Sequence, residues 1–171
     1  MNLTISDLDT KSIVFDKIRN EILKYNFRII KEDQTRPWGG FFVIDESQTS
    51  DFAAQFFSNL KADEIQTSGK LSPKILVVSP NSRLSWQYHF RRSEIWKVVS
   101  GPVGVKISDT DVEGELTTLN QGDFIQMDKG ERHRLIGLSS WGIVAEIWQH
   151  TDADNPSDEN DIVRLQDDFG R

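Results

Sequence analysis

Four side chains that can bind a metal ion stand in two short segments of this chain. Gln87, His89 and Glu94 fall in one short run, and His133 follows in a second segment punctuated by glycine. In an extended strand, side chains two residues apart share a face, and a short turn can bring the glutamate in from the next strand. Imidazole nitrogen, carboxylate oxygen and amide oxygen would then converge on one point. A divalent cation needs that convergence, within about 2.0–2.2 Å if it is zinc.

Basic side chains accompany this pattern. Arg91 and Arg92 follow the first histidine, Arg134 follows the second, and Lys74 begins the strand expected before them. Arginine binds phosphate through two parallel donors, and lysine adds a point charge. These residues are therefore candidates to hold a phosphate group beside the metal. The alternative for each arginine is pairing with a surface carboxylate.

The composition bounds the class of protein. The chain has 171 residues, which suits one domain with a real core. Its 20 Lys and Arg against 27 Asp and Glu give a net charge of −7, so the surface as a whole should repel nucleic acid and anionic membranes. The absence of cysteine excludes disulfides and fits a reducing cytoplasm. We find neither a signal-peptide pattern nor an apolar run long enough to span a membrane, and expect a soluble, cytoplasmic protein.

The first third of the chain differs in pattern from the rest. Amphipathic helices are predicted at residues 11–25, with an N-cap at Thr10, and at 51–60, with an N-cap at Ser50. From residue 74 onward, short β-like runs alternate with turn residues, which indicates an antiparallel sandwich or small barrel. The expected strands are 41–44, 74–79, 84–90, 94–100, 103–107, 116–119, 124–127, 133–136 and 142–149. An acidic, solvated loop is expected at 152–160, before a closing segment at 161–171.

The spacing of these residues resembles that of the cupin superfamily. The first cupin motif is matched by Gln87-x-His89-x4-Glu94-x6-Gly101, with glutamine for its leading histidine. The second is matched by Gly122-x5-Asp128-x-Gly130-x2-His133, with aspartate for proline. More narrowly, residues 36–171 resemble the cupin domain of type II mannose-6-phosphate isomerases. The matching blocks are Arg36 to Gly39, Lys74 to Pro80, Leu84 to Gln87, Glu94 to Gly101, His133 to Leu135 and Asp161 to Arg171.

The resemblance implies a fold and a metal site. The fold would be all-β, a cupin double-stranded β-helix (jelly-roll barrel) at residues 36–171, with an N-terminal helical extension at 1–35. The cofactor would be a divalent metal, most simply zinc, held by Gln87, His89, Glu94 and His133. The third histidine, His150, fits neither motif and is expected at a strand end. Cupins often pair through exposed strands, so a homodimer is also expected.

The resemblance also implies an enzyme, an aldose–ketose isomerase that acts on a phosphosugar such as mannose 6-phosphate through a cis-enediolate. The candidate catalytic residues are Lys74, Arg134 and Glu146, and the candidate substrate-binding residues are Arg91, Arg92 and Arg171. Either Lys74 or Glu146 would be the base, with Arg134 beside the enediolate.

Two departures from the family pattern leave a second hypothesis open. Arg91 and Ile95 stand where the family has histidines. A cupin that binds a sugar or sugar phosphate without turnover is therefore the alternative. Metal-dependent oxygenation is a weaker third reading, because those cupins usually rely on three histidines and only two are placed here to bind.

Overall fold

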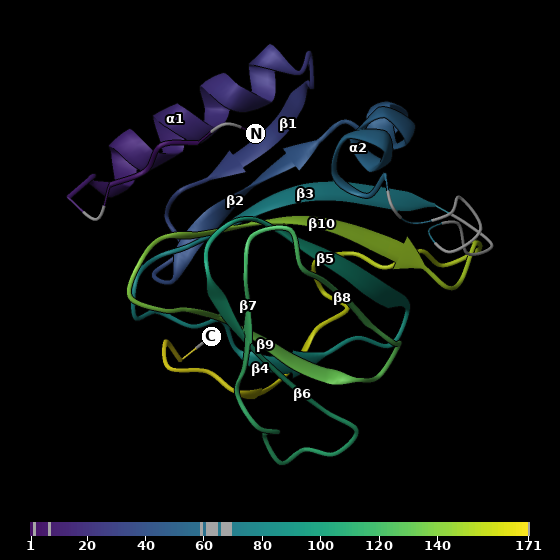
Figure 1. Ribbon diagram of the computed structural model, residues 1–171. Helices are drawn as coiled ribbons and strands as arrows, with labels where there is room; N and C mark the ends of the chain where they lie inside the picture. The colour runs from purple at the N-terminus through teal and green to yellow at the C-terminus, as the bar shows by residue number, and fades with distance from the viewer. Residues whose placement is uncertain (2, 7, 59, 61–64, 66–69, 171) are drawn as a thin grey trace.

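Two antiparallel sheets face each other, and two helices lie outside one of them (Figure 1). The computed structural model describes residues 1, 3–6, 8–58, 60, 65 and 70–170. The helices are α1 (Lys11–Lys24) and α2 (Thr49–Phe56), and a 3-10 turn spans Glu46–Gln48. The strands are β1 (Ile29–Asp33), β2 (Gly39–Ile44), β3 (Leu71–Val78), β4 (Trp86–Tyr88), β5 (Arg92–Ser100), β6 (Val103–Ser108), β7 (Thr117–Leu119), β8 (Phe124–Met127), β9 (Arg132–Gly137), β10 (Gly142–His150) and β11 (Val163–Gln166).

Strands that are distant in the sequence pair within each sheet. The six-stranded sheet has the order β1-β2-β3-β10-β5-β8, and the five-stranded sheet has the order β11-β4-β9-β6-β7. β10 pairs with both β3 and β5 along most of its length. This architecture confirms the predicted β fold with an N-terminal helix.

The central strands β3, β10 and β5 separate two hydrophobic cores. Side chains of a strand alternate between its two faces. Ile75, Ile95 and Ile147 face a core shared with the helices, whereas Leu76 and Trp96 face a second core between the sheets. Polar residues with the parity of the second group therefore also point between the sheets, and that face carries the candidate site.

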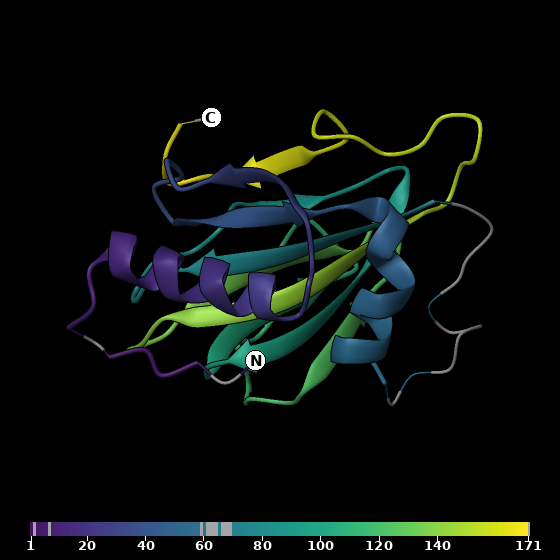
Figure 2. The ribbon, with the colours of Figure 1, turned by 90° about the horizontal axis from the view of Figure 1, so that it is seen from above.

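α1 confirms the predicted first helix. The Thr10 hydroxyl accepts from the Ile13 amide at 3.4 Å, which satisfies one of the unpaired donors of the first turn. Val14, Ile18 and Ile22 are fully buried against the outer face of the six-stranded sheet. Figure 2 shows the helix lying along that sheet when the molecule is seen from above.

The predicted N-cap of the second helix is wrong. α2 begins at Thr49, so Ser50 lies inside the helix, and the cap residue Gln48 makes no capping bond through its side chain. The chain turns earlier, where the Asp45 carboxylate accepts from the Ser47 amide at 2.8 Å and starts the 3-10 turn that leads into the helix. The predicted end at residue 60 is also too late, because α2 ends at Phe56.

Two edge strands were missed by the sequence patterns. β1 pairs with β2, and its sequence Ile-Ile-Lys-Glu-Asp lacks the apolar alternation of a half-buried strand. β11 is largely exposed and pairs with β4 inside the expected closing segment. The first 35 residues therefore contribute a strand as well as a helix. The division into residues 1–35 and 36–171 falls between two paired strands and stays a prediction.

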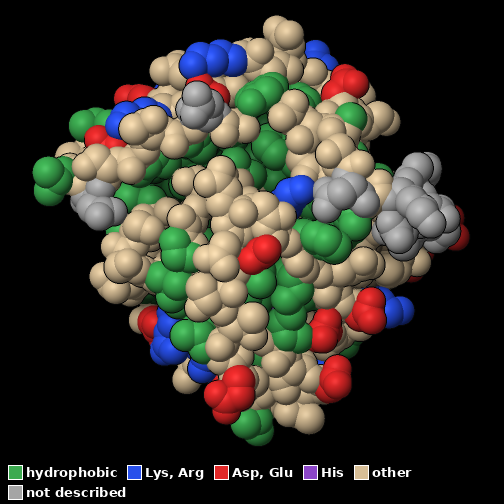
Figure 3. All heavy atoms as spheres, in the orientation of Figure 1, with side chains coloured by type: hydrophobic (Ala, Val, Ile, Leu, Met, Phe, Trp, Pro, Cys, Tyr) green, Lys and Arg blue, Asp and Glu red, His purple; other side chains and the backbone are tan. Residues whose placement is uncertain are grey.

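The surface mixes charged and apolar side chains. Figure 3 shows acidic, basic and hydrophobic groups interspersed on one face, with no histidine visible there. All three histidines are buried. Within the described ranges, none of the helices combines the length and the apolar character that crossing a bilayer would need. The predicted homodimer and cytoplasmic location stay predictions.

Candidate metal centre

The residues of the two predicted motifs meet between the sheets. Gln87 of β4 lies in register with His133 of β9, His89 follows β4 directly, and Glu94 lies on the inner face of β5. Ligand atoms of the two histidines and Glu94 all lie within 4.8 Å of one another, and all three residues are buried. His89 Nε2 lies 3.3 Å from Glu94 Oε1, and His133 Nε2 lies 3.5 Å from Glu94 Oε2.

A main-chain carbonyl orients each histidine. His89 Nδ1 donates to the Asp161 carbonyl at 2.5 Å, and His133 Nδ1 donates to the Glu131 carbonyl at 3.0 Å. Because a carbonyl only accepts, Nδ1 carries the proton in both rings when they are neutral. Burial lowers the pKa of His89 to about 3 and also lowers the pKa of His133. Both rings are therefore neutral at pH 7 and present Nε2 lone pairs, as metal ligands do.

This donor set fits a divalent cation. His133 Nε2 is buried and has no hydrogen-bond partner among the described residues. The His133 lone pair, buried beside the His89 imidazole and the Glu94 carboxylate, is costly to leave unpaired unless a cation or a donor takes it. Two imidazoles and a carboxylate form a set that zinc and other divalent transition metals accept.

Gln87 stands beside this cluster. Its Nε2 lies 3.4 Å from His89 Nε2, and its Oε1 accepts from the Ser85 hydroxyl at 2.5 Å. A half-turn of the amide would exchange the two atoms, and the Ser85 hydroxyl would then accept instead of donating. The side chain is therefore within reach of the cluster, and its role as a fourth ligand stays a prediction.

Arg92 balances the charge of Glu94. Its Nε donates to Glu94 Oε1 at 2.7 Å, its Nη2 to His89 Nε2 at 3.0 Å, and its Nη1 to the Ser157 hydroxyl at 2.8 Å. Burial acts to raise the pKa of Glu94, but Arg92 and the two histidines together outweigh it and hold that pKa below its usual range. Glu94 is therefore an anion. A cation at His89 would replace only the Nη2 bond, since the other two nitrogens keep their partners.

Lys74 and Glu146 lie beside the cluster on the same inner face. They oppose each other in the β3–β10 pair, and Glu146 also opposes Trp96 of β5. Trp96 Nε1 donates to Glu146 Oε1 at 2.9 Å and to Glu94 Oε2 at 3.2 Å, so one indole joins the two carboxylates. Burial, and then the charge of Glu94, raise the pKa of Glu146 to about 8, whereas burial lowers the pKa of Lys74.

A cavity of about 90 Å³ opens onto these groups. Its lining includes Lys74, Gln87, Arg92, Glu94 and Glu146. The volume corresponds to about three water molecules, whereas pockets for small molecules usually span about 300–1,000 Å³. A sugar phosphate therefore requires part of the wall to move.

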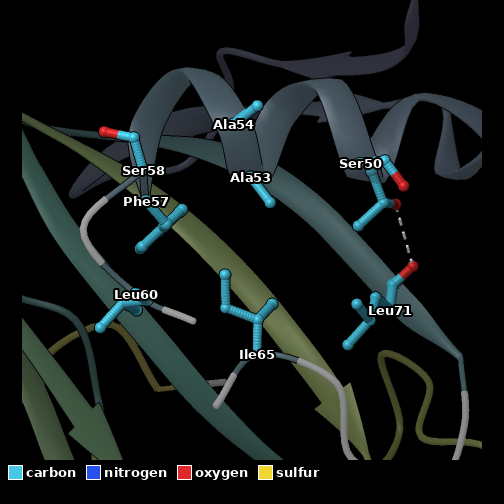
Figure 4. Close-up of a pocket in the computed structure, with 9 residues that line it drawn as sticks. Ser50, Ala53, Ala54, Phe57, Ser58, Leu60, Ile65 and Leu71 are labelled. Carbon is cyan, nitrogen blue, oxygen red and sulfur yellow. Dashed lines mark hydrogen bonds between the residues drawn. The ribbon is translucent and has the colours of Figure 1, made fainter. Parts of the chain in front are cut away.

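A larger hollow of about 450 Å³ lies on the other side of the six-stranded sheet, beside α2 (Figure 4). Figure 4 shows Ala53, Phe57, Ile65 and Leu71 around it. The described residues that line it are apolar or carry hydroxyl groups, and they include neither a charged side chain nor a histidine. The described part of this lining therefore offers no charged group for a metal or a phosphate.

The expected role of Arg134 is corrected by the structure. Arg134 follows His133 on β9, so its side chain points to the opposite face of the strand. There it is fully buried and donates to the Glu113 carboxylate and to Gln166. It is thus separated from the cavity in which an enediolate would form. Arg171 lies outside the described residues.

Arg91 also lies apart from the metal cluster. It donates to Asn155 Oδ1 at 2.6 Å, to the Pro156 carbonyl at 3.1 Å and to the Asp158 carboxylate at 3.2 Å. Its side chain fastens the loop between β10 and β11, which is a correction to its expected place beside the substrate. Arg92 lies two residues before Glu94 on β5, so its side chain points to the same inner face. Among the described arginines that were expected to bind substrate, it is the one that lines the cavity.

Sequence reasoning missed the part played by Asp161. Its carbonyl orients His89, and its carboxylate accepts from the amides of Phe90 and Arg91 at 3.0 and 2.9 Å. The residue stands in the closing block of the family resemblance, which was the one signal that could have found it. No local pattern joins residues 72 positions apart.

The His133→Ala variant is expected to lose bound metal while keeping its fold. The imidazole supplies one of the three converging ligands, and its removal also removes a buried, unpaired nitrogen. The metal content after loading with zinc and the far-UV circular dichroism spectrum measure the two properties.

The control for this prediction is His150→Gln. His150 ends β10 as expected and contacts the Ser72 hydroxyl at 2.9 Å, outside the His/Glu/His cluster. The control should keep its metal. Global unfolding of His133→Ala, or metal retained at the wild-type level, would show that this histidine serves packing instead.

The fold and the site together define the class of protein. Two facing antiparallel sheets with two histidines and a glutamate from two successive motifs between them form a cupin. The structure is similar to that of an oxalate decarboxylase, OxdC, from Bacillus subtilis, with a TM-score of 0.57 and 13% identity over 79% of this chain and 30% of that one. This likeness supports the fold alone, and the predicted cupin resemblance is confirmed.

Within that class, the chain belongs to the family described as mannose-6-phosphate isomerase C-terminal, which it matches over residues 53–167. It is 35% identical over 109 residues to the alginate biosynthesis protein AlgA of Pseudomonas aeruginosa, covering 64% of this chain and 21% of AlgA. It is 30% identical over 111 residues to the mannose-1-phosphate guanylyltransferase ManC of Salmonella typhimurium, covering 65% of this chain and 22% of ManC. The match thus covers about a fifth of these relatives' length.

Proposed function

We propose that this protein is a metal-dependent isomerase that interconverts an aldose phosphate and a ketose phosphate, with mannose 6-phosphate as the first candidate substrate. The observation that carries the proposal is the position of Glu146 and Lys74 on the same inner face as the His89, Glu94 and His133 cluster. The family description and the relative that acts on mannose 1-phosphate support a sugar phosphate as the ligand.

His89, Glu94 and His133 would hold the cation, with Gln87 as a fourth ligand and zinc as the proposed metal. A divalent cation bound there would act as a Lewis acid toward the sugar carbonyl and the negative charge of the cis-enediolate. Arg92 helps to keep Glu94 ionised. Its Nη2 also donates to His89 Nε2, and a bound cation would replace this one contact.

Glu146 is the proposed acid–base group. Isomerisation requires that one group remove a proton from the carbon beside the carbonyl and return it to the neighbouring carbon. A carboxyl with a pKa of about 8 exists in both protonation states near neutral pH, so it can act in both directions. The Trp96 indole donates to Glu146 Oε1 and leaves the other oxygen for the substrate. Lys74 opposes this carboxyl and would hold an anionic group of the sugar.

The second candidate is a cupin that binds a sugar or sugar phosphate without turnover. Two observations favour it: the cavity is small, and Arg91 and Ile95 replace histidines of the family pattern. Arg91 fastens a loop instead of reaching the cavity, and Ile95 faces the outer core. Neither substitution, however, removes a member of the metal cluster.

A coupled assay with mannose 6-phosphate and other aldose phosphates separates the two candidates. The zinc-loaded protein is expected to form the ketose phosphate, and a chelator is expected to abolish the reaction, with recovery when zinc is restored. Unphosphorylated mannose is the control substrate and should react far more slowly. Tight binding of sugar phosphates with no turnover of any would favour the binding module and reject the isomerase.

A further inference from the structure

The loop between β10 and β11 places a carboxylate against the wall of the cavity. Lys74 Nζ donates to Glu159 Oε1 at 2.8 Å, and no other hydrogen-bond acceptor for this ammonium occurs in the part of the chain that the structure describes. The Lys74 side chain is 6% exposed, whereas that of Glu159 is 58% exposed. A buried cation of the cavity is thus paired with an acid that reaches in from the solvent. Figure 2 shows this loop in yellow, above the strands.

The main chain of this loop is held without the help of Glu159. Arg92 Nη1 donates to the Ser157 hydroxyl at 2.8 Å and to the Asp158 carbonyl at 3.2 Å. On the other side, the Asp161 carboxylate accepts from two main-chain amides in the turn after β4. The Glu159 side chain can therefore leave Lys74 while the loop stays in place. That movement takes the hydrogen-bond acceptor away from a buried ammonium, so it requires another anion to take the place of the carboxylate.

Aromatic rings hold Lys74 in position. Its Nζ lies 3.3 Å from the centroid of the Trp148 ring and 5.4 Å from that of Phe41. These rings favour a cation at this place, whether or not a carboxylate is present. The ammonium therefore remains available at the cavity wall when Glu159 swings away.

The charge of the cavity wall suits an anion. The charged residues that line it are Arg36, Lys74, Arg92 and Arg164 against Glu94, Glu146 and Glu159. Arg36 is paired with Asp33 at 2.9 Å, which leaves three cations against three carboxylates in the wall when every carboxylate is ionised. Withdrawal of Glu159 then leaves an excess of one cation, in a chain of net charge −7. Arginine forks and a lysine point charge are the donors that a phosphate dianion takes.

The small volume of the cavity also indicates a role for the Glu159 side chain. Its 90 Å³ must expand to admit a sugar phosphate. Glu159 lines the cavity, is mostly exposed, and is held by a single ion pair among the described contacts. Its withdrawal enlarges the cavity and exposes Lys74 in one movement.

We propose that Glu159 is an internal competitor for the phosphate of the ligand, and so determines the specificity of the cavity for phosphorylated sugars. A phosphate dianion displaces the Glu159 carboxylate from Lys74. An uncharged sugar offers no charge to replace it and leaves the cavity closed. This inference rests on the proposed function in one respect, that the ligand is a sugar phosphate.

Titration of the zinc-loaded protein with inorganic phosphate, followed by 31P NMR, tests the inference. Glu159→Gln keeps the shape of the side chain and removes its charge, and it should bind phosphate at least about fivefold more tightly, because the carboxylate competes for a buried ammonium. Asp154→Asn is the matched control, because Asp154 lies exposed on the same loop and makes no contact with Lys74. Lys74→Met should weaken phosphate binding, and adding Glu159→Gln to it should bring no gain.

Equal tightening in Glu159→Gln and Asp154→Asn would overturn the inference, since the effect would then belong to net charge. Unchanged phosphate affinity in Glu159→Gln would overturn it as well. Turnover plays no part in this titration. If Glu159→Gln binds phosphate more tightly but the wild type shows no isomerase turnover, the proposed reaction alone is rejected. If the wild type is an active isomerase but Glu159→Gln leaves the phosphate affinity unchanged, this inference alone is rejected.

Discussion

Glu146→Gln is expected to lower isomerase turnover by about 10²- to 10⁴-fold while the protein keeps its metal, because the variant retains the shape of the side chain and loses the proton-transfer group. The Trp96 indole can still donate to the amide oxygen, so the packing between β5 and β10 should persist. Steady-state kinetics on protein of measured zinc content report the effect. Glu115→Gln makes the same chemical change at an exposed position and should have no effect.

The pH dependence of this pair of proteins gives a second readout. If the ionised carboxylate removes the first proton, wild-type turnover rises with pH as Glu146, whose pKa burial raises, loses its proton. The groups that act on it are Lys74, Glu94, Arg92 and the Trp96 indole. Glu146→Gln should lose that limb of the profile. Full turnover in this variant, or a wild-type rate that is independent of pH between 6 and 9, would remove Glu146 from the mechanism.

The free energy of unfolding should decrease as pH rises, whereas turnover increases. Folding raises the pKa of Glu146 from its ordinary value of 4.5 to about 8, so ionisation opposes the folded state. Relative to Glu146→Gln, the free energy of unfolding of the wild type is highest below pH 4.5 and falls as pH rises through 8. Between pH 4 and pH 9 the wild type should lose stability relative to the variant by an amount on the order of a few kcal/mol.

Glu94→Gln is expected to abolish metal binding and to lower the free energy of unfolding by about 3–5 kcal/mol, because it leaves the Arg92 guanidinium buried beside a neutral amide. Arg92 and Glu94 are each less than 5% exposed, so water does not screen the unpaired charge. Urea denaturation of metal-free protein measures the stability, and metal analysis after loading with zinc measures the binding.

The double variant Arg92→Met/Glu94→Gln is the control for this prediction. It removes both charges of the buried pair, and an apolar side chain of similar length takes the place of the guanidinium. The double variant should recover much of the lost stability and should still bind no metal. A double variant no more stable than Glu94→Gln would mean that the cost does not arise from the unpaired guanidinium.

The parts of the fold that could be predicted from sequence are those with local causes. α1 was predicted because its cap and its 3.6-residue period occur within one segment. The inward convergence of His89, Glu94 and His133 followed from motif spacing in a resembling family. β1 was not predicted, because its extended conformation is stabilised by pairing with β2 and not by an apolar alternation in its own sequence.

The errors at the site concern side-chain direction and distant contacts. Residue parity along a strand already separates Arg134 from His133, and it groups Arg92 with Glu94. Proximity in the sequence was a poorer guide than this parity. The contacts of Glu159 with Lys74 and of Asp161 with His89 depend on a loop that returns from far along the chain. No local pattern encodes such a return.

Crystals of the zinc-loaded protein, measured on both sides of the zinc absorption edge, test the central claim most directly. The anomalous difference map should show one strong peak bounded by His89 Nε2, Glu94 and His133 Nε2, and the peak should be absent from His133→Ala crystals grown in the same way. A map from fully loaded protein with no peak at these three side chains, or with its main peak elsewhere, would contradict the metal centre and the reaction proposed for it.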